Sequence, residues 1–274
     1  MLLRQRSGQA RPPSRHTPTV WAKVAPVKTP SLKTLRIATY NIAKGVQGVG
    51  PARRLEIHNL GHAVEQLDAD VVCLQEVRKH NHQHARHFDR WPDQPQADFL
   101  APEGYEAVYQ TNAVTRHGEH GNALLSRWPV VSQKHEDMSD HALEQRGLLH
   151  VVVQFDRRPV HVVVLHLGLI AGSRARQVAQ LGTYLQREVP ADTPLVVAGD
   201  LNDWGGQLRP AMNALALHDC PTTPPVRTFP ARLPLAQLDY VYARGLKPLS
   251  VHVPRGRIWW RMSDHLPLIA EFAL

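Results

Sequence analysis

Cysteines and long apolar runs are scarce in this sequence of 274 residues. Cys73 lies in an apolar stretch and Cys220 stands beside a proline, and neither has the spacing of a zinc or redox motif. No apolar run approaches the roughly 20 residues that span a bilayer. Residues 1–33 also lack the apolar core of a secretory signal. We therefore expect a cytoplasmic protein with reduced cysteines and no membrane-spanning helix.

Acidic residues are absent from residues 1–33, which hold seven basic residues and five prolines. Such a segment buries too little apolar surface to offset its ordering entropy, so we expect a disordered, basic, proline-rich tail. The tail could contact a membrane surface or nucleic acid, or it could simply be solvated.

The net charge of the protein comes mainly from this tail. Removing its seven charges from the 32 basic residues leaves 25 basic against 24 acidic residues over 34–274. The pI near 9.8 therefore gives no argument that this part of the chain binds DNA. We expect residues 34–274 to form one domain and the protein to be a monomer.

Strand-like apolar runs outnumber helical patterns after the tail. Strands are predicted over 35–42, 71–77, 123–125, 148–155, 160–167, 195–198, 238–242 and 268–272, and helices over 53–67, 174–189 and 208–217. The stretches 80–102 and 221–234 lack periodicity, and we expect loops there. Because some strands are apolar on both faces, the pattern predicts an α/β (α+β) protein with packed sheets covered by helices.

Short motifs of acidic, amide and histidine residues end several predicted strands. In chain order they are Thr39-Tyr40-Asn41-Ile42, Leu74-Gln75-Glu76-Val77, Leu165-His166-Leu167, Gly199-Asp200-Leu201-Asn202-Asp203, Leu238-Asp239-Tyr240 and Ser263-Asp264-His265-Leu266-Pro267. Carboxylate and amide oxygens are the ligands that Mg²⁺ prefers. The set therefore indicates a Mg²⁺-dependent hydrolase of phosphate esters.

Three motifs have a chemical interpretation beside a purely structural one. Glu76 directly follows an apolar strand and suits a metal ligand, with an ordinary surface carboxylate as the alternative. Asp200 and Asn202 share one side of an extended chain and can hold a water and a phosphoryl oxygen, although both residue types also form turns. Asp264 and His265 place a carboxylate beside an imidazole, which exchanges protons near neutral pH.

The ordered set resembles the endonuclease/exonuclease/phosphatase family of Mg²⁺-dependent phosphoesterases. Its members include DNase I, abasic-site endonucleases, neutral sphingomyelinases and inositol-polyphosphate phosphatases. The resemblance covers residues 35–273. It implies a four-layer sandwich in which two packed, mostly antiparallel β-sheets are flanked by helices. It also implies a site where loops gather at one end of the sheets, with Mg²⁺, or Mn²⁺ as a substitute, as the cofactor.

The resemblance assigns roles near the metal and the substrate. Asn41 and Glu76 look like the amide and the acid around Mg²⁺, and Asp264 resembles a further carboxylate on the metal side. Asn122, in the run Gly121-Asn122-Ala123, matches a family segment beside the substrate cleft.

Five further positions match the catalytic residues of the family. Asp200 and Asn202 look like the pair that orients water and phosphate. His265 looks like the catalytic histidine, and Asp239 like the aspartate hydrogen-bonded to it. His166 stands where abasic-site endonucleases carry a tyrosine, and this resembles DNase I, the sphingomyelinases and the inositol phosphatases instead.

A second departure also separates the chain from the repair enzymes. Abasic-site endonucleases carry Asn-x-Asp at the first strand, whereas this chain has Asn41-Ile42-Ala43. We therefore expect a phosphodiesterase that acts by direct attack of water on a lipid or small-molecule phosphodiester. A DNase-like endonuclease and a non-catalytic scaffold that retains the fold are the alternatives.

Two other segments invite interpretation. Residues 254–262, PRGRIWWRM, could clamp phosphates and stack on bases, lie at a lipid interface, or pack on the core. The alternating histidines of residues 80–87 could bind a transition metal, although such a run is more typical of a solvated polar loop.

Overall fold

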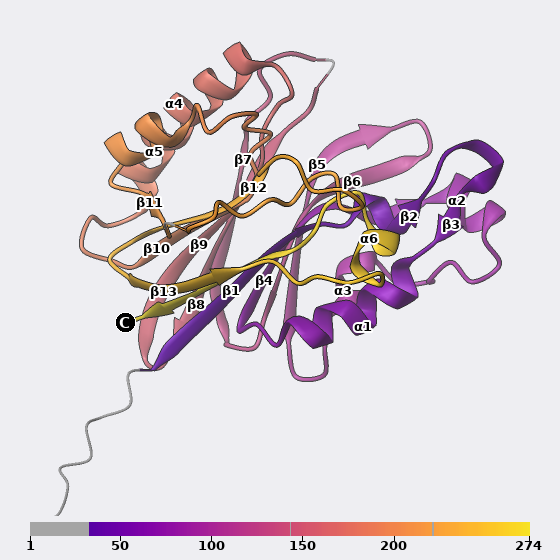
Figure 1. The fold of residues 1–274 in the computed structure, drawn as a ribbon, viewed down its shortest axis with the longest axis horizontal. Coiled ribbons are helices and arrows are strands. Elements are labelled where there is room, and N and C mark those ends of the chain that lie inside the picture. The colour runs from indigo at the N-terminus through magenta and orange to yellow at the C-terminus, as the bar shows by residue number, and fades with distance from the viewer. Residues whose placement is uncertain (1–32, 143, 221) are drawn as a thin grey trace, which may run out of the picture. The chain divides into compact units, whose positions relative to one another are not determined.

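A computed structural model describes residues 33–142, 144–220 and 222–274. The predicted tail therefore lies outside the described residues, apart from Lys33. Two six-stranded sheets packed face to face form the centre of the described chain (Figure 1). No helix in the described ranges combines the length and apolar character needed to cross a bilayer.

The first sheet has the strand order β13-β14-β1-β4-β6-β5. Its strands are β1 (Thr34–Asn41), β4 (Val71–Asn81), β5 (Glu106–Thr115), β6 (Gly118–Ser126), β13 (Lys247–His252) and β14 (Leu268–Ala273). Strands β1 and β4 run parallel, with Asn41 opposite Gln75, and the other pairs are antiparallel. Because two parallel strands end at the same edge, Asn41 and the end of the apolar run in β4 meet there.

The second sheet repeats this plan with the order β11-β12-β10-β9-β8-β7. Its strands are β7 (Val130–Asp137), β8 (Gly147–Phe155), β9 (Arg158–His166), β10 (Leu195–Asp200), β11 (His218–Asp219) and β12 (Asp239–Arg244). Strands β9 and β10 run parallel and place His166 opposite Asp200. The antiparallel partner β12 places Asp239 on the other side of Asp200.

Three clusters of buried side chains hold four layers together. One cluster lies between the sheets and includes Val71, Val162 and Val196. A second joins the first sheet to α1 (Ile57–Leu67), α3 (Gln96–Leu100) and α6 (Trp259–Met262), and a third joins the second sheet to α4 (Ala171–Glu188) and α5 (Arg209–Ala214). The helices thus cover both outer faces (Figure 1), and the predicted four-layer sandwich is confirmed.

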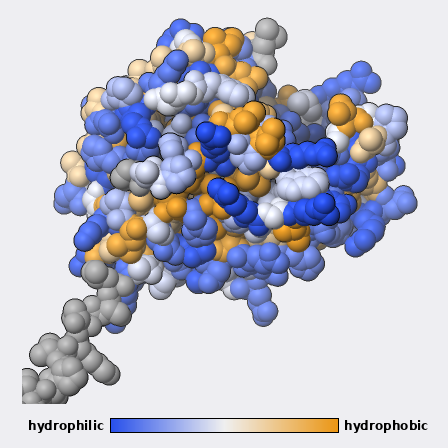
Figure 2. Space-filling view, viewed as in Figure 1, coloured by the Kyte–Doolittle hydropathy of each residue, from blue (hydrophilic) through white to orange (hydrophobic). Residues whose placement is uncertain are grey.

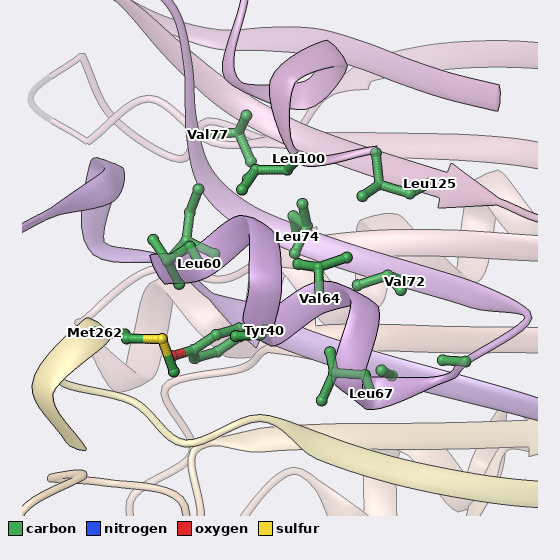
Figure 3. Close-up of a cluster of buried hydrophobic side chains, with 14 of the residues drawn as sticks. Tyr40, Leu60, Val64, Leu67, Val72, Leu74, Val77, Leu100, Leu125 and Met262 are labelled. Atoms are coloured by element: carbon green, nitrogen blue, oxygen red, sulfur yellow. The ribbon is translucent and has the colours of Figure 1, made fainter. Parts of the chain in front are cut away.

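Strand β4 shows why its sequence is a continuous apolar run. Val71 and Cys73 face the cluster between the sheets, whereas Val72 and Leu74 face the helices. Figure 3 shows Leu74 and Val72 beside Val64 of α1. Successive side chains of a strand point to opposite faces, so a strand buried on both faces is apolar at every position.

Several predicted boundaries were wrong. The stretch 80–102, expected as a loop, contains α2 (His82–His87) and α3. The helix predicted over 53–67 begins at Ile57, after the short strands β2 (Val46–Gln47) and β3 (Arg54–Leu55). Short 3₁₀ turns cover Ala43–Gly45 and Gly50–Ala52. The strands β5, β7, β11 and β13 and the helix α6 were not predicted.

Candidate active site

The ends of the two parallel strand pairs face each other across the sandwich. Asn41, at the end of β1, donates a hydrogen bond from Nδ2 to Oδ2 of Asp200, at the end of β10, over 3.0 Å. Both side chains are buried. One hydrogen bond thus joins the first sheet to the second at the edge where the sequence motifs meet.

Asp200 lies at the centre of the site. Its Oδ2 is 3.5 Å from Nε2 of His166 and 3.6 Å from Nε2 of His265, and its Oδ1 accepts the backbone N–H of Asn202 over 3.0 Å. The preceding Gly199 has φ +155°, and a Cβ there would lie 1.9 Å from the carbonyl oxygen of Leu165. Glycine is therefore required for β10 to approach β9 closely at this point.

His265 is held by a second buried carboxylate. Its Nδ1 donates to Oδ2 of Asp239 over 2.8 Å, so its Nε2 is directed toward Asp200. Burial alone would lower the pKa of His265, but Asp239 and Asp200 outweigh burial and raise the pKa to about 10. His265 is therefore a cation at neutral pH.

His166 has the opposite electrostatic character. Burial lowers the pKa of its imidazole to about 4, although the charge of Asp200 opposes this shift. Burial also raises the pKa of the Asp200 carboxyl, against the effect of both histidines. One carboxylate thus contacts a neutral imidazole on one side and an imidazolium on the other.

Glu76 lies at a β-bulge that ends the apolar part of β4. The pairing of β4 with β6 shifts register between Leu74 and Val77, and Glu76 has φ +56°. Its Oε2 is 2.9 Å from Nζ of Lys44. Burial would raise the pKa of Glu76, but Lys44 and His166 outweigh it and lower the pKa to about 2. The carboxylate is therefore ionised and already attracts a cation.

The Ser263-Asp264-His265 segment is tied to the end of β1. The Ser263 hydroxyl donates to the carbonyl oxygen of Asn41 over 2.6 Å and accepts the backbone N–H of His265 over 3.2 Å. Asp264 is exposed, and its charge is among the causes that raise the pKa of His265. The predicted metal-side carboxylate thus lies near His265 and is open to solvent.

Asn202 and Asn122 are both used in internal hydrogen bonds. Asn202, at φ +49°, donates from Nδ2 to the carbonyl oxygen of Leu167 over 2.9 Å. Asn122 is fully buried and donates to the carbonyl oxygens of Gly147 and Val164, over 2.9 and 3.2 Å. Since Asn122 lies on β6 and its acceptors lie on β8 and β9, it joins the two sheets. Its predicted substrate-binding role stays a prediction.

The structure brings five predicted site residues into one connected group: Asp200 contacts Asn41, His166 and His265, and His265 contacts Asp239. Asn202 joins this group through its backbone N–H, which donates to the Asp200 carboxylate. Glu76 and Asp264 lie close enough to this group for their charges to raise the pKa values of His166 and His265, respectively.

The chemistry of the donor set fits a divalent cation. Glu76, Asp264 and the amide oxygen of Asn41 are hard oxygen donors suited to Mg²⁺ or Mn²⁺. The Glu76 carboxylate is ionised and paired with the Lys44 ammonium, so a divalent cation bound there would share this carboxylate with the ammonium or displace it. Asp200, Asp239 and His265 also offer ligand atoms within 4.8 Å of one another. In this second group, Nδ1 of His265 and Oδ2 of Asp239 are already hydrogen-bonded to each other.

Lys44 was missed as a site residue. The side chain of Gln96 donates to its carbonyl oxygen over 2.9 Å, which holds its backbone at φ +62° with the ammonium directed at Glu76. The sequence did contain a signal for this residue, because a lysine three positions after Asn41 and directly before Gly45 lies in a turn close to the predicted site. Thr228 was missed as well: its buried hydroxyl accepts the backbone N–H of Asp239 over 3.3 Å.

Comparisons with known proteins agree with this geometry. The sequence profile of the Endonuclease/Exonuclease/phosphatase family matches residues 38–265. The protein YbhP of Escherichia coli (strain K12) is 36% identical over 248 residues, which cover 88% of this chain and 97% of that protein.

Solved structures share the fold. The endonuclease/exonuclease/phosphatase from Beutenbergia cavernae DSM 12333 has a TM-score of 0.71 at 24% identity, and the match covers 88% of this chain and 72% of the Beutenbergia chain. The human Nocturnin catalytic domain has a TM-score of 0.65 at 21% identity, and the match covers 88% of this chain and 93% of the Nocturnin chain. Because the profile spans most of the sequence and the architecture agrees, the chain belongs to the endonuclease/exonuclease/phosphatase family.

Proposed function

We propose that this protein is a divalent-metal-dependent phosphodiesterase that hydrolyses a lipid or small-molecule phosphodiester by direct attack of water. The observation that carries this proposal is the buried Asp200 carboxylate, whose Oδ2 is contacted by Asn41, His166 and His265. Burying a carboxylate is costly unless it is paired, and buried titratable groups with shifted pKa values are concentrated at functional sites. A binding scaffold has no need of this arrangement.

Glu76 and Asn41, with Asp264, would hold the divalent cation. When bound, the cation neutralises charge on a non-bridging phosphate oxygen and on the leaving oxygen.

The remaining roles belong to the side chains. Asp200 accepts the proton of the attacking water, since burial raises its pKa toward the range of a useful base. The cationic His265, held by Asp239, stabilises the negative charge that develops at phosphorus. The neutral His166 donates a hydrogen bond to a phosphate oxygen. Asn202 keeps the Asp200 carboxylate oriented through its backbone N–H.

The substrate class is supported by charge and by the groups around the site. Residues 34–274 carry nearly equal numbers of basic and acidic residues, whereas duplex-binding proteins concentrate basic residues on a contact face. Exposed apolar side chains occur on segments next to site residues, including Leu169, Ile170 and Trp204. These features favour a substrate with an apolar part over a DNA duplex.

Hydrolysis of bis(p-nitrophenyl) phosphate tests the activity. We expect turnover with Mg²⁺ or Mn²⁺, loss of turnover with EDTA, and a loss of about 10²-fold or more in Asp200→Asn. Asp192→Asn is the matched control and should keep full activity. Asp192 is exposed and precedes the first residue of β10, whereas Asp200 is the last residue of that strand. A well-folded wild-type protein that shows no metal-dependent turnover would favour the scaffold.

Substrate class is tested by parallel assays. Sphingomyelin and glycerophospholipid vesicles, soluble glycerophosphodiesters and plasmid DNA are offered to the same preparation. Preferential turnover of a lipid or small phosphodiester supports the proposal, whereas efficient cleavage of plasmid DNA alone would make the protein a DNase-like nuclease.

A further inference from the structure

A groove of about 910 Å³ lies beside the catalytic histidine. One wall is the segment 224–234, between β11 and β12, and the other is the segment 252–260, which leads from β13 into α6. Leu266, the residue after His265, is buried and contributes to the lining. Figure 2 shows hydrophilic side chains interleaved with apolar ones on the face that carries α6.

The groove has a strongly positive lining. Its charged side chains are Arg227, Arg232, Arg255 and Arg257, and its lining includes no aspartate or glutamate. Within the part of the chain that the structure describes, none of the four forms an ion pair with a carboxylate. Four exposed guanidinium groups around a groove whose lining has no carboxylate form a local excess of positive charge, which attracts an anion.

The groove is also partly preorganised. The guanidinium of Arg232 lies over the ring of Trp260, 5.4 Å from its centroid, in a cation–π contact that joins the two walls. Trp260 is half-buried against the helix-side core, and the walls carry Pro224 and Pro225. Arginine presents a planar fork of donors that matches phosphate oxygens, so a fixed arginine loses less freedom on binding.

Hydrogen bonds join the wall formed by residues 224–234 to the segment that carries His265. The backbone N–H of Ala231 donates to the carbonyl oxygen of Asp264 over 2.7 Å, and that of Leu266 donates to the carbonyl oxygen of Thr228 over 2.8 Å. The ring of Phe229 lies 4.9 Å from that of His265. A molecule that occupies the groove therefore lies next to the reacting centre.

We infer that this groove binds a second phosphate group of the substrate, a phosphomonoester or pyrophosphate carried beside the scissile phosphodiester. The inference rests on the proposed function, because it assigns the groove to a part of the same substrate. Four positive charges match a group with two or more negative charges better than the single charge of a phosphodiester. A terminal group also suits a groove confined between two walls.

Binding of inorganic pyrophosphate to metal-free protein tests the groove separately from catalysis. Calorimetry in EDTA compares the wild type with Arg255→Gln/Arg257→Gln, and with Arg157→Gln/Arg158→Gln on the exposed β8–β9 turn as the matched control. Each lost charge-assisted contact weakens binding by roughly tenfold or more. We expect that loss in the groove variant, and both wild-type affinity for pyrophosphate and wild-type turnover of bis(p-nitrophenyl) phosphate in the control.

Two arms identify the source of the phosphate group. Glycerol 3-phosphate represents a soluble ligand, and phosphatidylcholine vesicles with and without phosphatidic acid represent a lipid headgroup. Binding to either that is lost in the groove variant supports the inference and names the source. Equal pyrophosphate affinity in wild type and groove variant overturns it. So does an oligonucleotide without terminal phosphates that binds as tightly as pyrophosphate, because the groove would then recognise a nucleic-acid backbone.

The two hypotheses fail in different ways. If bis(p-nitrophenyl) phosphate is not hydrolysed, the phosphodiesterase proposal fails while the pyrophosphate titration still reports on the groove. If it is hydrolysed but the arginine substitutions leave pyrophosphate binding unchanged, only the groove assignment fails. Equal thermal unfolding of the variants and the wild type shows that the exposed substitutions preserve the fold.

Discussion

At the scale of single residues, the site depends on environments that give similar groups different charges. His166 and His265 both lie within 3.6 Å of Oδ2 of Asp200, yet their pKa values move to about 4 and about 10. The difference comes from Asp239, which contacts only His265. Titratable groups whose pKa values are pushed apart in one site are a general sign of divided acid and base roles.

The Asp239–His265 pair should act as a unit. His265→Ala and Asp239→Asn should each lower kcat/KM by about 10²–10⁴-fold, because the aspartate fixes and stabilises the imidazolium. The double variant should then lose little more than the worse single variant, since both changes remove one interaction. Steady-state rates on bis(p-nitrophenyl) phosphate check this, and a double defect equal to the product of the single defects would show that the residues work separately.

Glu76 should control metal affinity. Glu76→Gln removes one negative charge from the oxygen donors and should weaken Mg²⁺ binding and turnover by an order of magnitude or more, while the unfolding temperature stays close to the wild-type value. Calorimetric Mg²⁺ titration measures the affinity. Glu65→Gln, on the exposed face of α1, is the control. Wild-type Mg²⁺ affinity in Glu76→Gln would show that the carboxylate is not a ligand.

The polar residues of the site could be predicted from the sequence because they end apolar strands in a recognisable order. Lys44 could not, because its contact with Glu76 depends on a left-handed turn held by Gln96, more than 50 positions away. Nor could the internal hydrogen bonds of Asn122, whose acceptors lie on two strands of the other sheet. Contacts between distant segments leave no local pattern.

At the scale of elements, the strands that were predicted are central and the strands that were missed lie at or near sheet edges. Strands β5 and β13 are the two edges of the first sheet, and β7 and β11 are the edges of the second. Strand β7 is exposed or half-buried along its whole length. An edge strand packs little apolar surface, so its sequence lacks the apolar run that marks a central strand. Helix α6, with four residues, is too short to show periodicity.

The junction of β9 and β10 should depend on Gly199. In Gly199→Ala the added Cβ meets backbone, which cannot move without separating β9 from β10, so we expect a loss of about 2–4 kcal/mol in the free energy of unfolding. Gly61→Ala is the matched control, because Gly61 lies inside α1 with open space around it and should gain about 0.5–1 kcal/mol. Urea unfolding measures both. Equal stability of the two variants would show that β9 and β10 are not tightly apposed there.

At the scale of the whole molecule, the site exists only because two similar sheets pack against each other. Each contributes one parallel strand pair, and the ends of both pairs meet at the bond between Asn41 and Asp200. Strands that are apolar on both faces predict two packed sheets, but this pattern does not determine which strand ends of the two sheets meet. That part of the prediction came from the family resemblance, because the order of the motifs specifies the pairing of distant strands.

Stability of the whole protein should fall in mild acid, in part because of a buried histidine network outside the site. His150 contacts the Tyr184 hydroxyl over 3.0 Å and His161 over 2.9 Å, and burial, followed by the charge of His161, lowers the pKa of His150 to about 4. An unfolded histidine titrates near 6.5, so between pH 6.5 and 4 the unfolded chain binds the extra proton. The free energy of unfolding therefore falls as pH falls through this window.

His150→Gln isolates this contribution, because glutamine retains hydrogen-bonding groups but does not titrate. Between pH 7 and pH 5, the wild type should lose roughly 2 kcal/mol more stability than the variant, the value that follows from a pKa of about 4 in the folded state. Urea unfolding at both pH values measures the difference, and His62→Gln on the exposed face of α1 should leave it unchanged. Parallel pH dependence in the wild type and His150→Gln would mean that His150 takes up its proton in the folded protein as readily as in the unfolded chain.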